Sequence, residues 1–128
     1  MVIAGLLLAG LAALFHVYVF YLESIAWTRE RTRSTFRTTA QEAAVTKSLA
    51  FNQGFYNLFL ALVVVIGLIA FATGSAVVGA TLVFAGAGSM VAAGLVLLLS
   101  SRDLARAALA QLVPPLLAVI LLAIGLLT

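Results

Sequence analysis

The chain has 128 residues, of which 65% are hydrophobic and 9% are charged. A soluble domain carries about 45–50% apolar and about 25% charged residues, so these proportions exclude an ordinary water-soluble fold and indicate one apolar domain over residues 1–128. The sequence has no cysteine, which excludes disulfides, thiolate metal sites and cysteine nucleophiles. The net charge of +3 comes from basic residues beside the apolar runs, which favours contact with lipid head groups over nucleic-acid binding.

Four apolar stretches are each close to the ~20 residues that cross about 30 Å of hydrocarbon. Backbone N–H and C=O groups in hydrocarbon need partners within their own segment, so each stretch is expected to form a helix. The predicted fold is an all-α, polytopic membrane four-helix bundle. Its spans cover approximately residues 2–27, 48–72, 75–99 and 104–127.

The connections between these spans differ in charge. The segment Thr28–Lys47 holds five basic and two acidic residues, and the connection 100–103, together with Arg106, is also basic. The connection at 73–75 and both termini carry no charged side chain. The positive-inside rule therefore predicts that both basic connections lie in the cytoplasm and both termini outside it, in the bacterial cytoplasmic (inner) membrane.

One stripe of the first span follows spacings of four and three. It comprises Gly5, Ala9, Ala13, His16, Phe20, Glu23 and Trp27. The small residues of the outer half favour close packing of another helix. An ionisable group at the centre of a membrane helix costs about 2.5–3.5 kcal/mol, so His16 and Glu23 should face a partner or water. In simpler interpretations, Glu23 reaches interfacial water or pairs with Lys47, and His16 hydrogen-bonds Asn57.

The connection before the second span contains a helix-start signal. Thr39 and Glu42 are spaced as a capping box, in which the two side chains satisfy each other's free backbone N–H groups. Two structures fit this signal. Either the second helix begins near Ala40 and projects into the cytosol, or a short interfacial helix forms there.

The second span carries a polar face, because Asn52 and Tyr56, like Gln53 and Asn57, are four residues apart. At about 1.5 Å per residue, His16 and Asn57 both lie about 15 Å from the cytoplasmic end. Antiparallel helices joined by one loop are usually neighbours, so we infer one polar cluster in the cytoplasmic half of the bundle. Its members are His16, Glu23, Asn52, Gln53, Tyr56, Asn57 and, from the fourth span, Gln111.

The third and fourth spans carry few polar side chains. Small residues that favour close packing of the third span are Gly79, Gly86, Gly88, Ser89 and Ala92. The fourth span contains Pro114-Pro115, which lack backbone N–H groups, so the carbonyls of Ala110 and Gln111 should lose their donors and the helix should kink. The kink serves either packing alone or a locally opened backbone that lines a cavity.

The segment Ala50–Leu60 contains the string Asn-Gln-Gly-Phe-Tyr-Asn. Together with His16, Tyr21-Leu22-Glu23 and Trp27, it resembles the bacterial membrane family catalogued as domain of unknown function 1304. The resemblance covers nearly the whole chain in helix number and loop spacing, although the second half matches only in being apolar. It implies a four-helix membrane fold and no established activity. The characteristic polar and aromatic set that it implies is His16, Glu23, Trp27, Lys47, Asn52, Gln53, Tyr56 and Asn57.

Four functions are compatible with the polar cluster, and binding of a small apolar or amphipathic molecule is favoured. The expected ligand-binding residues are His16, Glu23, Trp27, Asn52, Gln53, Tyr56, Asn57 and Gln111. In the alternatives, the chain is an enzyme that uses His16 and Glu23 as acid and base on a lipid-soluble substrate, a small proton-coupled exporter, or an accessory subunit. Homo-oligomerisation is also expected for so small a bundle. No cofactor is expected, and no metal, since His16 and Glu23 are separated by about 10 Å along the helix.

Overall fold

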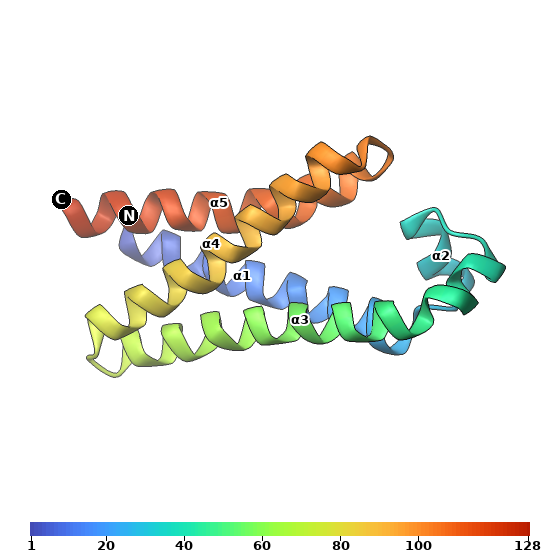
Figure 1. Cartoon of the computed structure of the whole chain (residues 1–128). Helices are drawn as coiled ribbons and strands as arrows, with labels where there is room; N and C mark the ends of the chain where they lie inside the picture. The colour runs from blue at the N-terminus through green and yellow to red at the C-terminus, as the bar shows by residue number, and fades with distance from the viewer.

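The computed structural model describes all 128 residues and contains helices but no strand (Figure 1). The all-α prediction is confirmed. In chain order the elements are α1 Val2–Phe20, a π-helical turn Tyr21–Ile25, α2 Glu30–Phe36, α3 Ala40–Ala72, α4 Ala76–Ser100, a 3-10 turn Arg102–Leu104 and α5 Ala105–Leu127.

Four helical segments are long and apolar enough to cross a membrane, as the composition predicts. They are Val2–Ile25, Ala40–Ala72, Ala76–Ser100 and Arg102–Leu127. The outward surface of these segments carries large apolar side chains, including Leu7, Leu14 and Val77, which are all more than two-thirds exposed. A surface of this kind suits contact with lipid tails, so the chain is a multi-pass helical bundle by length and composition.

The helices form a ring in which each contacts two neighbours. The α1 and α4 helices do not pack extensively on each other, and both pack against α3 and α5. Both termini and the α3–α4 turn lie at one end of the bundle, and the two basic connections lie at the other (Figure 1). At that second end the α1–α3 hairpin diverges from the α4–α5 hairpin (Figure 1).

The capping box at the start of α3 is present. The Glu42 backbone N–H donates to Thr39 Oγ1 at 3.2 Å, and the Thr39 backbone N–H donates to Glu42 Oε2 at 2.8 Å. The helix has 33 residues, or about 50 Å, which exceeds the ~30 Å of hydrocarbon. The capping box therefore starts the long second helix at Ala40, and the separate short helix α2 lies before it in the chain.

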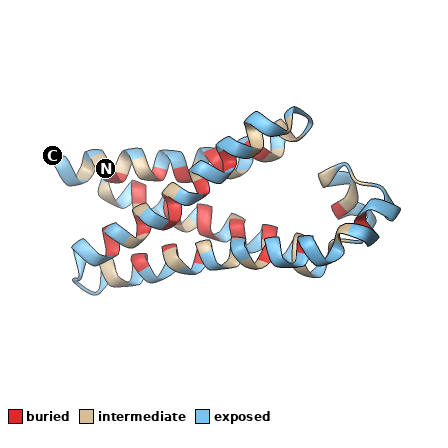
Figure 2. Ribbon diagram, viewed as in Figure 1, coloured by how far each residue is buried: buried red, intermediate tan, exposed pale blue.

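The core is built from small side chains, mostly alanine, on the inward faces of all four long helices (Figure 2). Close approach follows: a Cβ at Gly5 would lie 2.7 Å from the Leu122 backbone nitrogen, and one at Gly79 would lie 2.6 Å from Phe71 Cβ. Gly86 packs similarly against Val64. The packing prediction for the third span is wrong at Gly88, Ser89 and Ala92. A Cβ at 88 would meet no atom within 4 Å, and the other two residues are exposed, because they lie on the outward face.

The α5 helix remains α-helical through both prolines. Pro115 is among the most deeply buried residues of the chain. The proline pair therefore takes part in packing, and the kink angle stays a prediction.

Candidate functional site

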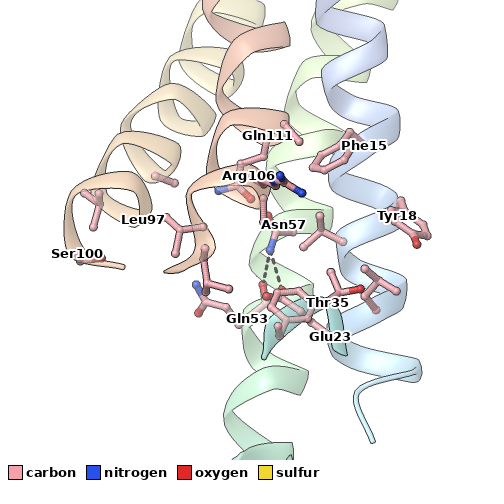
Figure 3. A pocket seen from close by; sticks show the side chains of 18 residues that line it. Phe15, Tyr18, Glu23, Thr35, Gln53, Asn57, Leu97, Ser100, Arg106 and Gln111 are labelled. Atoms are coloured by element: carbon pink, nitrogen blue, oxygen red, sulfur yellow. Dashed lines mark hydrogen bonds between the residues drawn. The ribbon is translucent and has the colours of Figure 1, made fainter. Parts of the chain in front are cut away.

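A cavity of about 780 Å³ lies between the two hairpins, at the end where they diverge (Figure 3). All four long helices and α2 line it. Eleven of its eighteen lining residues are hydrophobic, so most of the wall offers only van der Waals contact. Its polar or charged side chains within the bundle are Glu23, Gln53, Asn57, Ser100, Arg106 and Gln111.

The π-helical turn places Glu23 on this wall. In a π turn the backbone hydrogen bond spans five residues, and here the Ala26 N–H donates to the Tyr21 carbonyl at 2.9 Å. One extra residue in the turn rotates the side chains that follow relative to an ordinary α-helix. Turns of this kind are frequent at functional sites, and this one carries the acidic residue of the first span.

A close approach between the π turn and α3 fixes the position of Glu23 relative to the second span. A Cβ at Gly54 would overlap Ser24 Oγ and lie 3.1 Å from Glu23 Cβ, so only glycine fits at this crossing. The Ser24 hydroxyl donates to the Phe51 carbonyl at 2.8 Å, which adds a polar tie between the two helices. Gly54 therefore serves the geometry of the site as well as helix packing.

Asn57 joins the two helices across the site. Its Nδ2 group donates to Glu23 Oε2 at 2.8 Å and to the Gln53 carbonyl of its own helix at 3.2 Å (Figure 3). The predicted alternatives, in which Glu23 pairs with Lys47 and His16 pairs with Asn57, do not occur. Glu23 and Asn57 are partly buried, and each satisfies the other.

The α5 helix contributes Ala110 and Gln111 to the cavity wall, one turn before the proline pair. Neither Pro114 nor Pro115 has a backbone N–H, so the Gln111 carbonyl has no donor at either of its usual helical partners, three and four residues on. The carbonyl that lacks a helical donor because of the prolines therefore lies in the part of α5 that lines the cavity.

His16 does not join this group. Its ring is 1% exposed, and Nδ1 lies 2.9 Å from the Ala12 carbonyl of its own helix. It does not line the cavity, whereas Glu23 does. The structure consequently does not bring His16 and Glu23 together as an acid–base pair facing one space.

Asn52 and Tyr56 also lie apart from the cluster. Both are exposed, Tyr56 to 63%, although they are sequence neighbours of the cavity residues Gln53 and Asn57. Successive helical residues are rotated by about 100°, and only one of the two four-residue pairs can face inward. Of the seven predicted members, the structure gathers Glu23, Gln53, Asn57 and Gln111.

Trp27 borders a second cavity of about 520 Å³, which it shares with Glu23 and Gln53. Its indole Nε1 donates to Thr46 Oγ1 at 3.2 Å, and its ring packs on Phe36 with centroids 5.1 Å apart. Trp27 thereby holds α2 near the start of α3. Phe36 in turn lines the first cavity.

Arg106 and α2 are also parts of the site, although the sequence patterns do not indicate them. Thr35 and Phe36 of α2 line the cavity, but seven helical residues within a charged connection give only a weak pattern. The charge pattern accounts for Arg106 only as part of the basic charge at this end of the fourth span, whereas in the structure it also borders the cavity, from the first turn of α5. Its spacing of five from Gln111 gave no signal, because five residues turn about 140° away from a shared helix face.

The family profile described as "Protein of unknown function (DUF1304)" matches residues 10–123. The chain belongs to the DUF1304 family. The matched region includes all the residues that line the cavity, the whole of α3 and α4, and most of α1 and α5 of this DUF1304 bundle. No curated protein and no solved structure is significantly similar to the chain.

Proposed function

We propose that this DUF1304 chain binds a small apolar or amphipathic molecule in the cavity between its two hairpins. The cavity itself is the observation that carries the proposal. Its volume of about 780 Å³ falls within the ~300–1,000 Å³ of typical ligand sites, and its wall is mostly apolar with a few convergent polar groups.

The polar groups of the wall suit the orientation of such a ligand. Asn57 already satisfies one oxygen of Glu23. The amides of Gln53 and Gln111, which can both donate and accept, make no side-chain hydrogen bond of their own and border the same space. A ligand with one polar end would place that end among these amides and its apolar part along α4, where Ala93, Val96 and Leu97 line the wall.

The proposal places the protein in the lipid bilayer of the cytoplasmic membrane. By the positive-inside rule, the two basic connections face the cytoplasm, and the cavity lies at that end of the bundle. A ligand would then enter from the inner leaflet or from the cytoplasm. Homo-oligomerisation would leave this entry free if it used the opposite end of the bundle.

The test is native mass spectrometry of protein extracted from its own membranes, with a matched pair of variants. Both Ala93 and its neighbour Ala92 are exposed, but only Ala93 lines the cavity. Ala93→Phe should fill ligand space, and Ala92→Phe makes the same chemical change outside it. We expect a discrete bound mass on the wild type and on Ala92→Phe, reduced about tenfold on Ala93→Phe.

Two outcomes would contradict the proposal. In the first, the wild type carries no bound molecule, which is the result expected of an accessory subunit whose polar groups only hold helices together. In the second, Ala93→Phe retains the bound mass at the wild-type level, which would move the ligand to another surface. An Asn57→Ala variant measured beside them should also lose the ligand if the polar wall orients it.

A further inference from the structure

A third cavity, of about 510 Å³, adjoins the first at the end of the bundle where the basic connections lie. We name it the arginine basin. It lies between the end of α2 and the α4–α5 connection, and its polar lining consists of Ser34, Thr35, Arg37, Arg102, Asp103 and Arg106. The two hairpins thus bring together charged residues that are more than sixty positions apart in the sequence.

The basin carries an excess of positive charge, and its guanidinium groups are not hydrogen-bonded within the chain. Three arginines and one aspartate line it. Elsewhere, Arg29 donates to Tyr21 Oη at 2.9 Å and Arg33 to the Thr28 carbonyl at 3.2 Å. The guanidinium groups of the basin donate no hydrogen bond to protein, so their donors are available to an anion.

The backbone at Arg37 is strained. Its φ of 53° lies in the left-handed region, and it is the only non-glycine residue there. It ends α2 in a turn where the Arg37 N–H donates to the Ser34 carbonyl at 3.4 Å and the Thr38 N–H to the Arg33 carbonyl at 3.0 Å. Glycine is the usual residue at this position, so the chain keeps an arginine where it costs stability.

The basin lies directly beside the apolar cavity. Four residues border both spaces: Thr35, Leu104, Arg106 and Ala107. Glu23 lines the apolar cavity but not the basin, so its carboxylate does not oppose an anion there. A cationic cavity and a mostly apolar cavity are therefore neighbours at this end of the bundle.

We infer that the ligand is an amphiphile with a phosphate head group, whose phosphate occupies the arginine basin and whose hydrocarbon chain occupies the apolar cavity. This inference rests on the proposed function and names its ligand class. Guanidinium groups bind phosphate oxygens in pairs of parallel hydrogen bonds, and three of them surround one small space. The Ser34 hydroxyl adds a donor, while the Thr35 hydroxyl already donates to the Arg31 carbonyl at 3.0 Å and can still accept.

The test uses the only tryptophan, Trp27, whose ring packs on the cavity residue Phe36. Its fluorescence is followed in amphipol-held protein during titration with dodecyl phosphate, dodecanol or inorganic phosphate. The variants are Arg37→Gly, which suits the left-handed turn, and Arg102→Gln. The control is Arg31→Gln, which removes one charge from the same connection outside the basin.

We expect dodecyl phosphate to bind the wild type at least about tenfold more tightly than dodecanol, and each basin variant to lose about tenfold for dodecyl phosphate only. Arg31→Gln should retain wild-type affinity. Raised salt should weaken dodecyl phosphate and leave dodecanol unchanged.

The outcomes separate the two proposals. Equal affinity for both amphiphiles, unaffected by the arginine variants, would overturn the phosphate inference and leave the apolar site intact. Tight binding of inorganic phosphate alone would assign the basin to free phosphate and overturn the amphiphile. If neither amphiphile binds, the proposed function itself fails.

Discussion

Small residues have different roles at the two ends of the bundle. At the end that holds the termini, glycines press helices together: a Cβ at Gly125 would lie 2.6 Å from the Val2 nitrogen, and one at Gly67 would lie 2.9 Å from the Gly79 carbonyl. At the other end, Ala93, Ala107 and Ala110 border an open cavity. Small size permits contact only where another helix lies opposite. Where the hairpins diverge, as Figure 1 shows, small side chains leave an open space between the helices.

The difference suggests a division of labour along the bundle. Packing at the closed end brings the four helices together, and polar ties at the open end hold the α1–α3 hairpin together beside the cavity. Ser24, Asn57 and Trp27 supply these ties within the first hairpin. Substitutions at the closed end should therefore change stability most, and those at the open end should change the site more than the fold.

The largest effect is expected at Gly79. In Gly79→Ala the new methyl group would overlap α3 around Phe71 and Gly67, and helices packed at this distance cannot absorb it without separating. We expect a loss of about 2–3 kcal/mol in the free energy of unfolding. Gly88→Ala is the matched control on the same helix, because its methyl group meets no atom within 4 Å. Unfolding in mixed micelles measures both, and equal stability of the two variants would refute the packing argument.

A smaller effect is expected at Asn57. Asn57→Leu removes the donor to Glu23 and should lower the free energy of unfolding by about 1–1.5 kcal/mol, the upper range for interhelical hydrogen bonds in membranes. If the pair accounts for this loss, Asn57→Leu should have almost no effect in a Glu23→Ala background, which lacks the acceptor, and the double-mutant cycle measures the difference.

Asn52→Leu is the control for this comparison. Asn52 is exposed on the same helix, so its substitution should change stability by less than about 0.5 kcal/mol. A loss at Asn52 as large as the loss at Asn57 would show that the polar face stabilises the bundle as a whole.

At the start of α3 the expected effect is local. Thr39→Ala removes the acceptor for the Glu42 N–H and should cost about 1 kcal/mol of helix-end stability, which corresponds to about fivefold faster amide exchange in the first turns. Hydrogen exchange of the Ala43–Thr46 amides measures it. Ser48→Ala, a nearby exposed serine, should leave this exchange unchanged; slower exchange in Thr39→Ala would contradict the capping role.

The sequence predicted the fold well, because membrane length and apolar composition determine helices directly. The capping box also predicted the start of α3, through a local hydrogen-bond pattern that needs no tertiary information. The end of the first span was less predictable. The helix stops being α-helical at Phe20 and continues as a π turn to Ile25, because the contacts of Ser24 with Phe51 and Gly54 depend on a distant helix.

The site was only partly predictable. The stripe of α1 placed Glu23 correctly toward the interior, but His16 satisfied its ring within its own helix. Depth along the membrane gives the level of a residue but not the face of the helix on which it lies. Depth alone therefore groups Asn52 and Tyr56 with Gln53 and Asn57. The arginine basin was out of reach, since it depends on the separation of two hairpins and on α2.

The smallest expected effect is a gain in stability, and it concerns the strained backbone at Arg37. Arg37→Gly should stabilise the chain by about 0.5–1 kcal/mol, because glycine adopts the left-handed turn at little cost. Thermal unfolding measures the gain, with Arg31→Gln as the control for the lost charge. A variant that is more stable yet binds dodecyl phosphate less tightly would show that the basin keeps its arginine for the ligand and not for the fold. If Arg37→Gly is instead destabilised, the side chain stabilises the turn itself, and the strain at this position gives no reason to assign it a function.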